Sequence, residues 1–284
     1  MINRHILRTK DDVATKQTPP LLQHVMNGDF EAANAYVLAL KQSKPTTFQD
    51  VILNATAGIE TSSRRRWESI SPLAFAAWAG DFSDQPDQRY MLNMLLRHLP
   101  SHYLQRAIKQ LQLMQTSGTK QFGEIRNMMS AFQPLDASYA SYDYHFKTRT
   151  NEERDAYWNQ RVGAAQRQLP CFALQEFCRP TPWKPMPDFM NLPAPPRHPK
   201  LAGGTPLFPL SDSGLGVTFA LYHYGWIGGE PTSGNAGMTV GFNREVLRHL
   251  CETKKKQLVS IIQQHIATSS TPATQGEWPQ EASG

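Results

Sequence analysis

The chain has 284 residues, of which 40% are hydrophobic and 19% are charged, and this balance excludes wholesale disorder. No apolar run approaches the roughly 18–20 residues needed to span a bilayer, so the sequence predicts a soluble protein without a transmembrane segment. The formal net charge of +5 comes from basic residues spread along the chain. Scattered charges are typical of a solvated surface and do not favour nucleic-acid binding.

The two ends of the chain differ in composition from the rest. Residues 1–16 are polar and of mixed charge, and they lack the apolar stretch and the small-residue cleavage site of a secretory signal. Residues 268–284 are mostly small and polar. We therefore expect two flexible tails and no cleaved signal peptide.

Residues 17–135 contain a series of short amphipathic segments. Pro100 ends one predicted helix, and Ser101 is placed to cap the next. Apolar residues recur three and four positions apart in the stretches 30–40, 48–55, 91–99, 104–111 and 122–132. No segment is long enough to bury its apolar face alone, so the predicted helices must stack on one another.

Two further stretches of this region resemble each other. Pro20–Asp29 and Pro72–Asp81 both begin with Pro-Leu and end with Gly-Asp. Proline suits the first turn of a helix, and glycine suits the left-handed residue that ends one. The pattern resembles the ankyrin repeat, with its T-P-L-H-x-A-A-x-x-G signature. Because the two prolines lie 52 residues apart and a standard repeat has about 33, we expect a degenerate stack of helix pairs. An ordinary irregular helical bundle is the alternative.

A partner-binding surface is predicted on this stack and on the loop inserted before Pro72. Arginine and tryptophan are the residue types that most often anchor protein interfaces, and repeat stacks expose such surfaces. The predicted contacts are Arg64, Arg65, Arg66, Trp67, Trp78 and Asp81.

Residues 136–267 are predicted to form a separate C-terminal module. Thr150–Glu153 has the pattern of a capping box and should start a helix that ends at Pro170. Eleven of the 21 prolines then fall in residues 170–209, which indicates an extended segment that wraps the protein body. A glycine-rich stretch follows, with strand candidates at 216–224 and 238–242. Asn243 is expected to cap a last helix that runs to about Ile266.

Cys178 is the candidate for chemistry. A cysteine nucleophile needs a thiolate, a histidine base within hydrogen-bond reach and a group that orients the histidine. Arg179 could lower the pKa of the Cys178 thiol. The candidate bases are His145 and His223, and the candidate orienting groups are Asp143 and Asp212. The alternative is that Cys178 is a small buried residue, as free cysteines commonly are.

No metal site or cofactor is expected. The cysteines number three, so they cannot form a complete disulfide framework, and their count suits a reducing compartment. Structural zinc usually takes four Cys or His ligands in closely spaced pairs. Cys171 and Cys178 lie seven residues apart with no matching pair of histidines.

The middle of the chain resembles a known group of bacterial proteins. The segments that carry the resemblance are Tyr142–Phe146, Glu153–Trp158, Val162–Pro170 and Glu176–Pro180. They are similar to the region that follows the ankyrin repeats in Legionella effectors delivered by the Dot/Icm type IV secretion system. The resemblance implies a virulence protein that is secreted into the host cell cytoplasm and binds host proteins there. Some relatives carry a cysteine-protease-like module, which would make Cys178 the nucleophile.

The sequence thus predicts a mainly α protein, α+β overall. An ankyrin-like stack of helix pairs is followed by a Pro/Gly-rich module with a small sheet and a terminal helix. The predicted function is that of a translocated effector that binds one or more host proteins. The alternative is a thiol-dependent hydrolase or transferase centred on Cys178.

Overall fold

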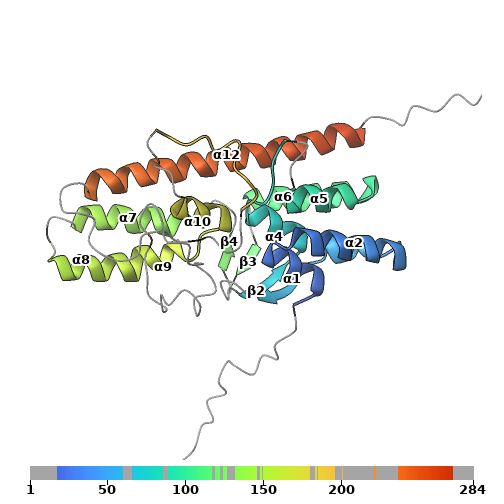
Figure 1. Cartoon of the computed structure of the whole chain (residues 1–284), viewed down its shortest axis with the longest axis horizontal. Coiled ribbons are helices and arrows are strands. Elements are labelled where there is room, and N and C mark those ends of the chain that lie inside the picture. The colour runs from blue at the N-terminus through green and yellow to red at the C-terminus, as the bar shows by residue number, and fades with distance from the viewer. Residues whose placement is uncertain are drawn as a thin grey trace, which may run out of the picture.

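The computed structural model describes residues 18–59, 66–85, 89–116, 119–121, 124–126, 132–145, 148, 150–179, 183, 185–195, 200, 221 and 236–270. Within these ranges the protein is mainly helical, with two small antiparallel sheets of two strands each. Helices lie side by side along the longest axis of the molecule, and the last helix extends over the others (Figure 1). The predicted fold class is therefore confirmed.

The first half of the chain follows the predicted order of helices. It contains α1 (Pro20–Asn27), α2 (Phe30–Ser43), α3 (Phe48–Leu53), β1 (Thr56–Ile59), β2 (Arg66–Ile70), α4 (Pro72–Trp78), α5 (Met91–His98) and α6 (Ser101–Thr116). The predicted helix at 122–132 is wrong where the structure describes it. That region holds the hairpin of β3 (Thr119–Gln121) and β4 (Glu124–Arg126), in which Thr119 is opposite Arg126.

The two similar stretches fold in the same way. Pro20 and Pro72 occupy the first turns of α1 and α4, and both helices end at a left-handed glycine, Gly28 with φ 75° and Gly80 with φ 72°. In each case the glycine N–H donates to the carbonyl three residues back, and the N–H of the next residue donates to the carbonyl five residues back. These are the two hydrogen bonds of a Schellman motif.

The helix pairs α1–α2 and α4–α5 lie side by side. The first helix of each pair packs on the first helix of the other, so that α1 contacts α4. The second helices likewise contact each other, α2 against α5. His98 of α5 and Asn34 of α2 form a hydrogen bond of 2.8 Å across this contact. Helix α6 packs on α3 and α4.

The second half begins with α7 (Gln133–His145) and continues through α8 (Asn151–Tyr157), a π-helical turn η2 (Trp158–Val162) and α9 (Gly163–Gln166) to α10 (Cys171–Cys178). The predicted capping box is confirmed. The N–H of Thr150 donates to Oε2 of Glu153 at 2.9 Å, and the N–H of Glu153 donates to Oγ1 of Thr150 at 3.3 Å. The helical stretch stops before Pro170, as predicted.

The terminal helix α12 (Ala236–Ser270) has 35 residues and starts earlier than predicted. The predicted strand at 238–242 is wrong because this stretch is helical. Once a helix has formed, each added residue contributes a backbone hydrogen bond, so the long amphipathic helix can extend through this stretch. The strand candidate at 216–224 lies outside the described residues except for Leu221. Both described sheets belong to the first half, whereas the predicted one was in the second.

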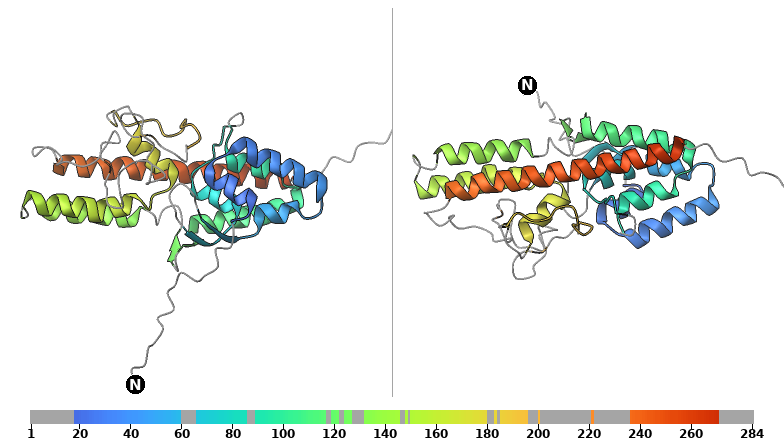
Figure 2. Two further views of the ribbon diagram at one scale, coloured as in Figure 1. Left: turned by 60° about the horizontal axis from the view of Figure 1, so that its bottom comes forward. Right: turned by 90° about the horizontal axis from the view of Figure 1, so that it is seen from above.

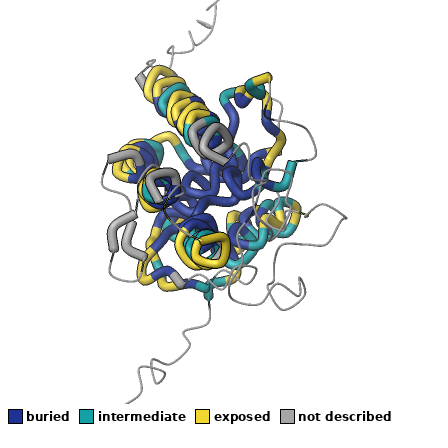
Figure 3. The backbone as a smooth tube through the Cα atoms, turned by 90° about the vertical axis from the view of Figure 1, so that its left-hand side faces the viewer, coloured by how far each residue is buried: buried dark blue, intermediate teal, exposed yellow. Residues whose placement is uncertain are grey.

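Helix α12 packs against elements of both halves. It contacts α6 of the first half and α7 of the second, and it runs along nearly the whole body of the molecule (Figure 2). Buried residues of both halves belong to one hydrophobic core. Seen along the longest axis, they gather in the middle, with exposed residues on the outer faces of the helices (Figure 3).

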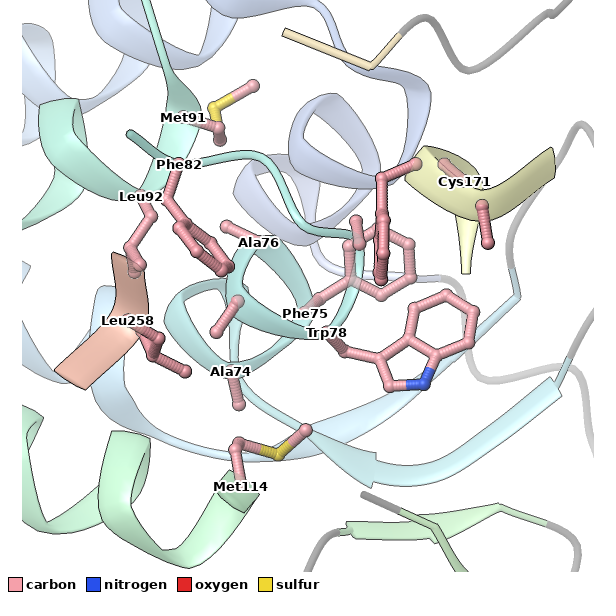
Figure 4. Close-up of a cluster of buried hydrophobic side chains, with 14 of the residues drawn as sticks. Ala74, Phe75, Ala76, Trp78, Phe82, Met91, Leu92, Met114, Cys171 and Leu258 are labelled. Carbon is pink, nitrogen blue, oxygen red and sulfur yellow. The ribbon is translucent and has the colours of Figure 1, made fainter. Parts of the chain in front are cut away.

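Helix α4 lies at the centre of this core. Every residue from Ile70 to Ser83 is buried. Phe82, Leu92 and Leu258 of α12 lie on one side of α4, and Cys171 of α10 lies on the side of Trp78 (Figure 4). Met114 of α6 lies below the helix in this view. The packing is close, because a Cβ at Gly80 would lie 2.4 Å from Cδ1 of Phe172. The first helix of the second pair is therefore covered by other parts of the same chain.

Candidate functional site

The structure divides the predicted partner-binding residues into two groups. Trp67, Trp78 and Asp81 are buried, with exposed fractions of 2%, 0% and 5%. Arg64 and Arg65 lie outside the described residues, and of Arg66 only the backbone, in β2, is described. The prediction that the two tryptophans and Asp81 form an exposed surface is therefore wrong.

The two tryptophans belong to an aromatic cluster in the core. The ring centroids of Trp67 and Trp78 are 4.8 Å apart, at an interplanar angle of 76°. Phe75 lies 5.7 Å from each of them. Edge-to-face contacts of this kind stabilise a core beyond the burial of area alone. All three rings are buried, so the fold itself accounts for their presence.

Cys178 does not have the environment of a reactive thiol. Burial raises the pKa of its thiol to about 12, so the thiol is protonated at neutral pH. Arg179, which was predicted to lower this pKa, instead forms an ion pair of 2.9 Å with Glu176. No hydrogen bond joins Cys178 to a histidine within the described part of the chain. The expectation of a pKa lowered by Arg179 is therefore wrong.

The other members of the predicted catalytic group cannot be placed around Cys178. His223 and Asp212 lie outside the described residues. Asp143 and His145 are in α7, but their side chains are also outside the described part. Among the described residues no group of three or more His, Cys, Asp or Glu side chains could hold a metal ion.

A cluster of buried and half-buried titratable groups, which the sequence analysis missed, lies where the halves of the molecule meet. We call it the Lys254 joint and define it by Asp81, Asp84, Tyr90, Glu176 and Lys254. Its members come from the loop after α4, from α10 and from α12. The side chain of Lys254 is 1% exposed, and that of Glu176 is 2% exposed.

Hydrogen bonds tie members of the Lys254 joint to the neighbouring backbone. Nζ of Lys254 donates to the carbonyl of Phe82 at 3.2 Å and lies 5.0 Å from the centroid of its ring. Oδ1 of Asp81 accepts a hydrogen bond of 3.0 Å from the N–H of Met91, at the start of α5. The hydroxyl of Tyr90 donates to the carbonyl of Leu192 in the proline-rich segment.

Burial shifts the pKa values of Lys254 and Glu176. It lowers the pKa of Lys254 to about 8, although the charges of Asp81, Asp84 and Glu176 act in the opposite direction. Burial also raises the pKa of Glu176, against the effect of Arg179. A lysine with a lowered pKa can be a nucleophile, but a nucleophile must be accessible to its substrate. With 1% of Lys254 exposed, we assign the joint a structural role: it fixes α12 on the loop after α4.

Lys254 is the first of three consecutive lysines, and it is in the core. The helical spacing in the sequence indicates the burial of Lys254. Lys254 lies three residues after Cys251 and four before Leu258, and both of these residues are buried. Its position on the apolar stripe of α12 indicates burial despite the charge. Lys255 and Lys256 are exposed.

The β1–β2 hairpin is the described surface that adjoins the predicted arginines. In its antiparallel register Gly58 is opposite Trp67 and Ile59 opposite Arg66. A Cβ at Gly58 would lie 2.9 Å from Cδ2 of Leu22, so this strand packs directly on α1. The N–H of Ile59 donates to Oγ1 of Thr18 at 3.0 Å.

The burial of the residues of β2 shows which of them face the core. Trp67 and Ile70 are buried, whereas Glu68 and Ser69 are exposed. One side of the hairpin is thus held by the core, and β2 also contacts β3. Arg64 and Arg65 immediately precede β2 in the chain.

Comparison with known proteins finds similarity to a bacterial protein without an assigned activity. The family model described as the CBUA0006 C-terminal domain matches residues 133–265, from the first residue of α7 into α12. The uncharacterized protein CBUA0006 of Coxiella burnetii (strain RSA 493 / Nine Mile phase I) is 26% identical over 223 residues. The match covers 71% of this chain but 62% of the relative, less than two thirds of its length. No solved structure matches the chain.

The chain is similar to a Coxiella protein over most of its length, and the family model covers the helices of its second half. No helix in the described ranges is both long enough and apolar enough to cross a membrane.

Proposed function

We propose that this chain is a bacterial effector that is delivered into a host cell by a type IV secretion system and acts there by binding a host protein. Binding takes place at the N-terminal stack of ankyrin-like helix pairs. The second half of the chain, with α12, holds this stack in a fixed shape.

The observation that carries the proposal is the repetition within the first half. The pairs α1–α2 and α4–α5 share the proline at the start, the left-handed glycine with its two hydrogen bonds, and the contacts of first helix with first helix and second with second. Stacked helix pairs of this kind form binding surfaces in repeat proteins. The sequence resemblance to Legionella ankyrin effectors and the similarity to a Coxiella protein support a bacterial origin and a role in a host.

The β1–β2 hairpin is the part of the stack that we propose as the contact. The inner face of α4 is excluded as a binding groove because every residue of that helix is buried. The hairpin lies between the two helix pairs in sequence, and Glu68 and Ser69 on it are exposed. Arg64, Arg65 and Arg66 are the anchors that we assign to this contact, since arginine is among the residues that contribute most to interfaces.

A protein-binding function fits the structure better than a thiol-dependent activity does. At a pKa of about 12, fewer than about one in 10,000 Cys178 thiols is ionised at neutral pH, and a neutral thiol is a poor nucleophile. The cation beside it is already paired with Glu176. We therefore do not propose a catalytic role for Cys178.

The test is a charge reversal at the hairpin. The double variant Arg65→Glu/Arg66→Glu should capture less of a host protein from cell lysate than the unaltered chain, with an unchanged melting temperature. Lys255→Glu/Lys256→Glu is the matched control, because both lysines are exposed on α12, away from the hairpin in sequence. Equal capture by the hairpin variant and the unaltered chain would refute the assigned contact. Loss of capture only in the α12 variant would place the interface on the terminal helix.

A further inference from the structure

A cavity of about 350 Å³ lies between α7 and α12. The two helices run next to each other in the second half of the molecule (Figure 1). Nearly all its described lining residues fall within residues 133–265, the stretch that matches the family model. Small-molecule sites have volumes from about 300 to 1,000 Å³, so this cavity is at the small end of that range.

The floor of the cavity is apolar and uncharged. Leu135 and Tyr139 line it from α7, and Leu247 and Cys251 line it from α12; all four are buried. Burial raises the pKa values of the Tyr139 hydroxyl and the Cys251 thiol, so both groups are neutral at pH 7. The hydroxyl of Tyr139 already accepts a hydrogen bond of 3.4 Å from Gln166. The floor thus offers contact to a hydrocarbon chain.

The rim of the cavity carries a net positive charge. Arg244 donates from Nε and Nη2 to the two carboxylate oxygens of Asp136, at 2.6 Å and 2.9 Å. This pairing holds the pKa of Asp136 below its ordinary value, so the carboxylate stays ionised. Arg248, one helical turn further along α12, is exposed and forms no hydrogen bond within the described ranges. Its charge also helps to lower the pKa of Asp136, and its exposed N–H groups can donate to a second anion.

Size, apolar floor and cationic rim together define a class of ligand. We propose that the cavity binds a small amphipathic carboxylate, such as a fatty acid of about ten carbons, with its chain on the floor and its carboxylate on Arg248. The volume of about 350 Å³ is at the small end of the range for ligand sites, which favours a short chain such as that of decanoate. This site is separate from the proposed protein-binding hairpin, so either can exist without the other.

Calorimetric titration of the full chain with decanoate tests the proposal. Decanoate should bind saturably, and Arg248→Gln should weaken binding at least tenfold, since hydrogen bonds to a charged group have this magnitude. Ala137→Phe, at an exposed position of the lining, should block entry and reduce binding to a similar extent. Lys255→Gln, an exposed change on the same helix outside the lining, should leave binding unchanged.

Ligand variants separate the roles of chain and charge. Decan-1-ol keeps the chain without the anion and should bind at least tenfold more weakly than decanoate; decylamine should bind more weakly still. Three results would overturn the proposal. They are no saturable binding of decanoate, decanoate binding by the Arg248→Gln and Ala137→Phe variants as tight as by the unaltered chain, and an affinity for decan-1-ol equal to that for decanoate. Binding to anionic phospholipid vesicles without binding to free decanoate would also overturn it, because the contact would then be with a membrane surface.

Discussion

Replacing Lys254 by methionine removes a buried charge at the joint between the two halves of the molecule. Methionine keeps a long unbranched side chain, so the packing around Phe82 changes little. The structure gives Lys254 a pKa of about 8, against an ordinary value of 10.5. Below pH 8 the amine is charged in the folded and the unfolded chain alike, and above pH 10.5 it is neutral in both. Between these values the unfolded chain binds more protons, so Lys254 makes the folded state more stable as pH rises.

The expected size follows from the shift. Each unit of pKa difference is about 1.4 kcal/mol, so the full effect of Lys254 is about 3 kcal/mol, and about 2 kcal/mol of it is gained between pH 7 and pH 9.5. The thiols of Cys178 and Cys251 have raised pKa values and act in the opposite direction above pH 9. The pH dependence of the free energy of unfolding of the unaltered protein therefore contains both effects. The difference in this free energy between the unaltered protein and Lys254→Met isolates the contribution of the lysine.

Urea denaturation followed by circular dichroism between pH 7 and 9.5 measures this difference. The free energy of unfolding of Lys254→Met should fall by about 2 kcal/mol relative to the unaltered chain over this range. Lys255→Met, at the exposed neighbouring position, should show a constant difference. A difference for Lys254→Met that stays constant within about 0.5 kcal/mol, the usual effect of a surface substitution, would refute the assignment of a buried amine with a lowered pKa.

Two further substitutions test the fold, one at the helix ends and one in the second half. Gly80→Ala should destabilise the protein by about 1–3 kcal/mol more than Gly28→Ala: both glycines are left-handed, but only at Gly80 does the new methyl group meet the ring of Phe172. Equal losses in urea denaturation would contradict this packing. Gln166→Leu should reduce the free energy of unfolding by about 2–6 kcal/mol, because the buried Gln166 amide bonds both the N–H and the carbonyl of Leu221, at 2.7 Å and 2.8 Å. A loss below about 1 kcal/mol would contradict that contact.

Local features of the chain were predicted well because local chemistry decides them. Prolines start α1 and α4, and glycines follow their ends. The backbone angles that these residues permit specify where the helices begin and end, without help from distant segments. The capping box at Thr150 is equally local, and its hydrogen bonds are present in the structure. The strand predicted at 238–242 failed because glycine and β-branched residues are weak signals beside a long amphipathic helix.

Burial could not be predicted where distant segments cover a residue. Trp67 and Trp78 have the composition of interface anchors, but α10 and α12, roughly 100 and 180 residues away in sequence, help to enclose the core around α4. The interpretation of Cys178 failed for a local reason, because Arg179 pairs with Glu176, three residues earlier in the chain. The burial of Lys254 was also missed, although its spacing from Cys251 and Leu258 places it on the buried face of the helix.

Site-specific photo-crosslinking tests the proposed contact with a host protein most directly. A benzoylphenylalanine residue at Glu68, exposed on the β1–β2 hairpin, should form a covalent adduct with a host protein when the full chain is irradiated in host cells. The same group at Lys256 on α12 should form none, and Arg65→Glu/Arg66→Glu should abolish the adduct at position 68. Adducts from position 256 alone, or none from position 68, would contradict binding at the hairpin between the helix pairs.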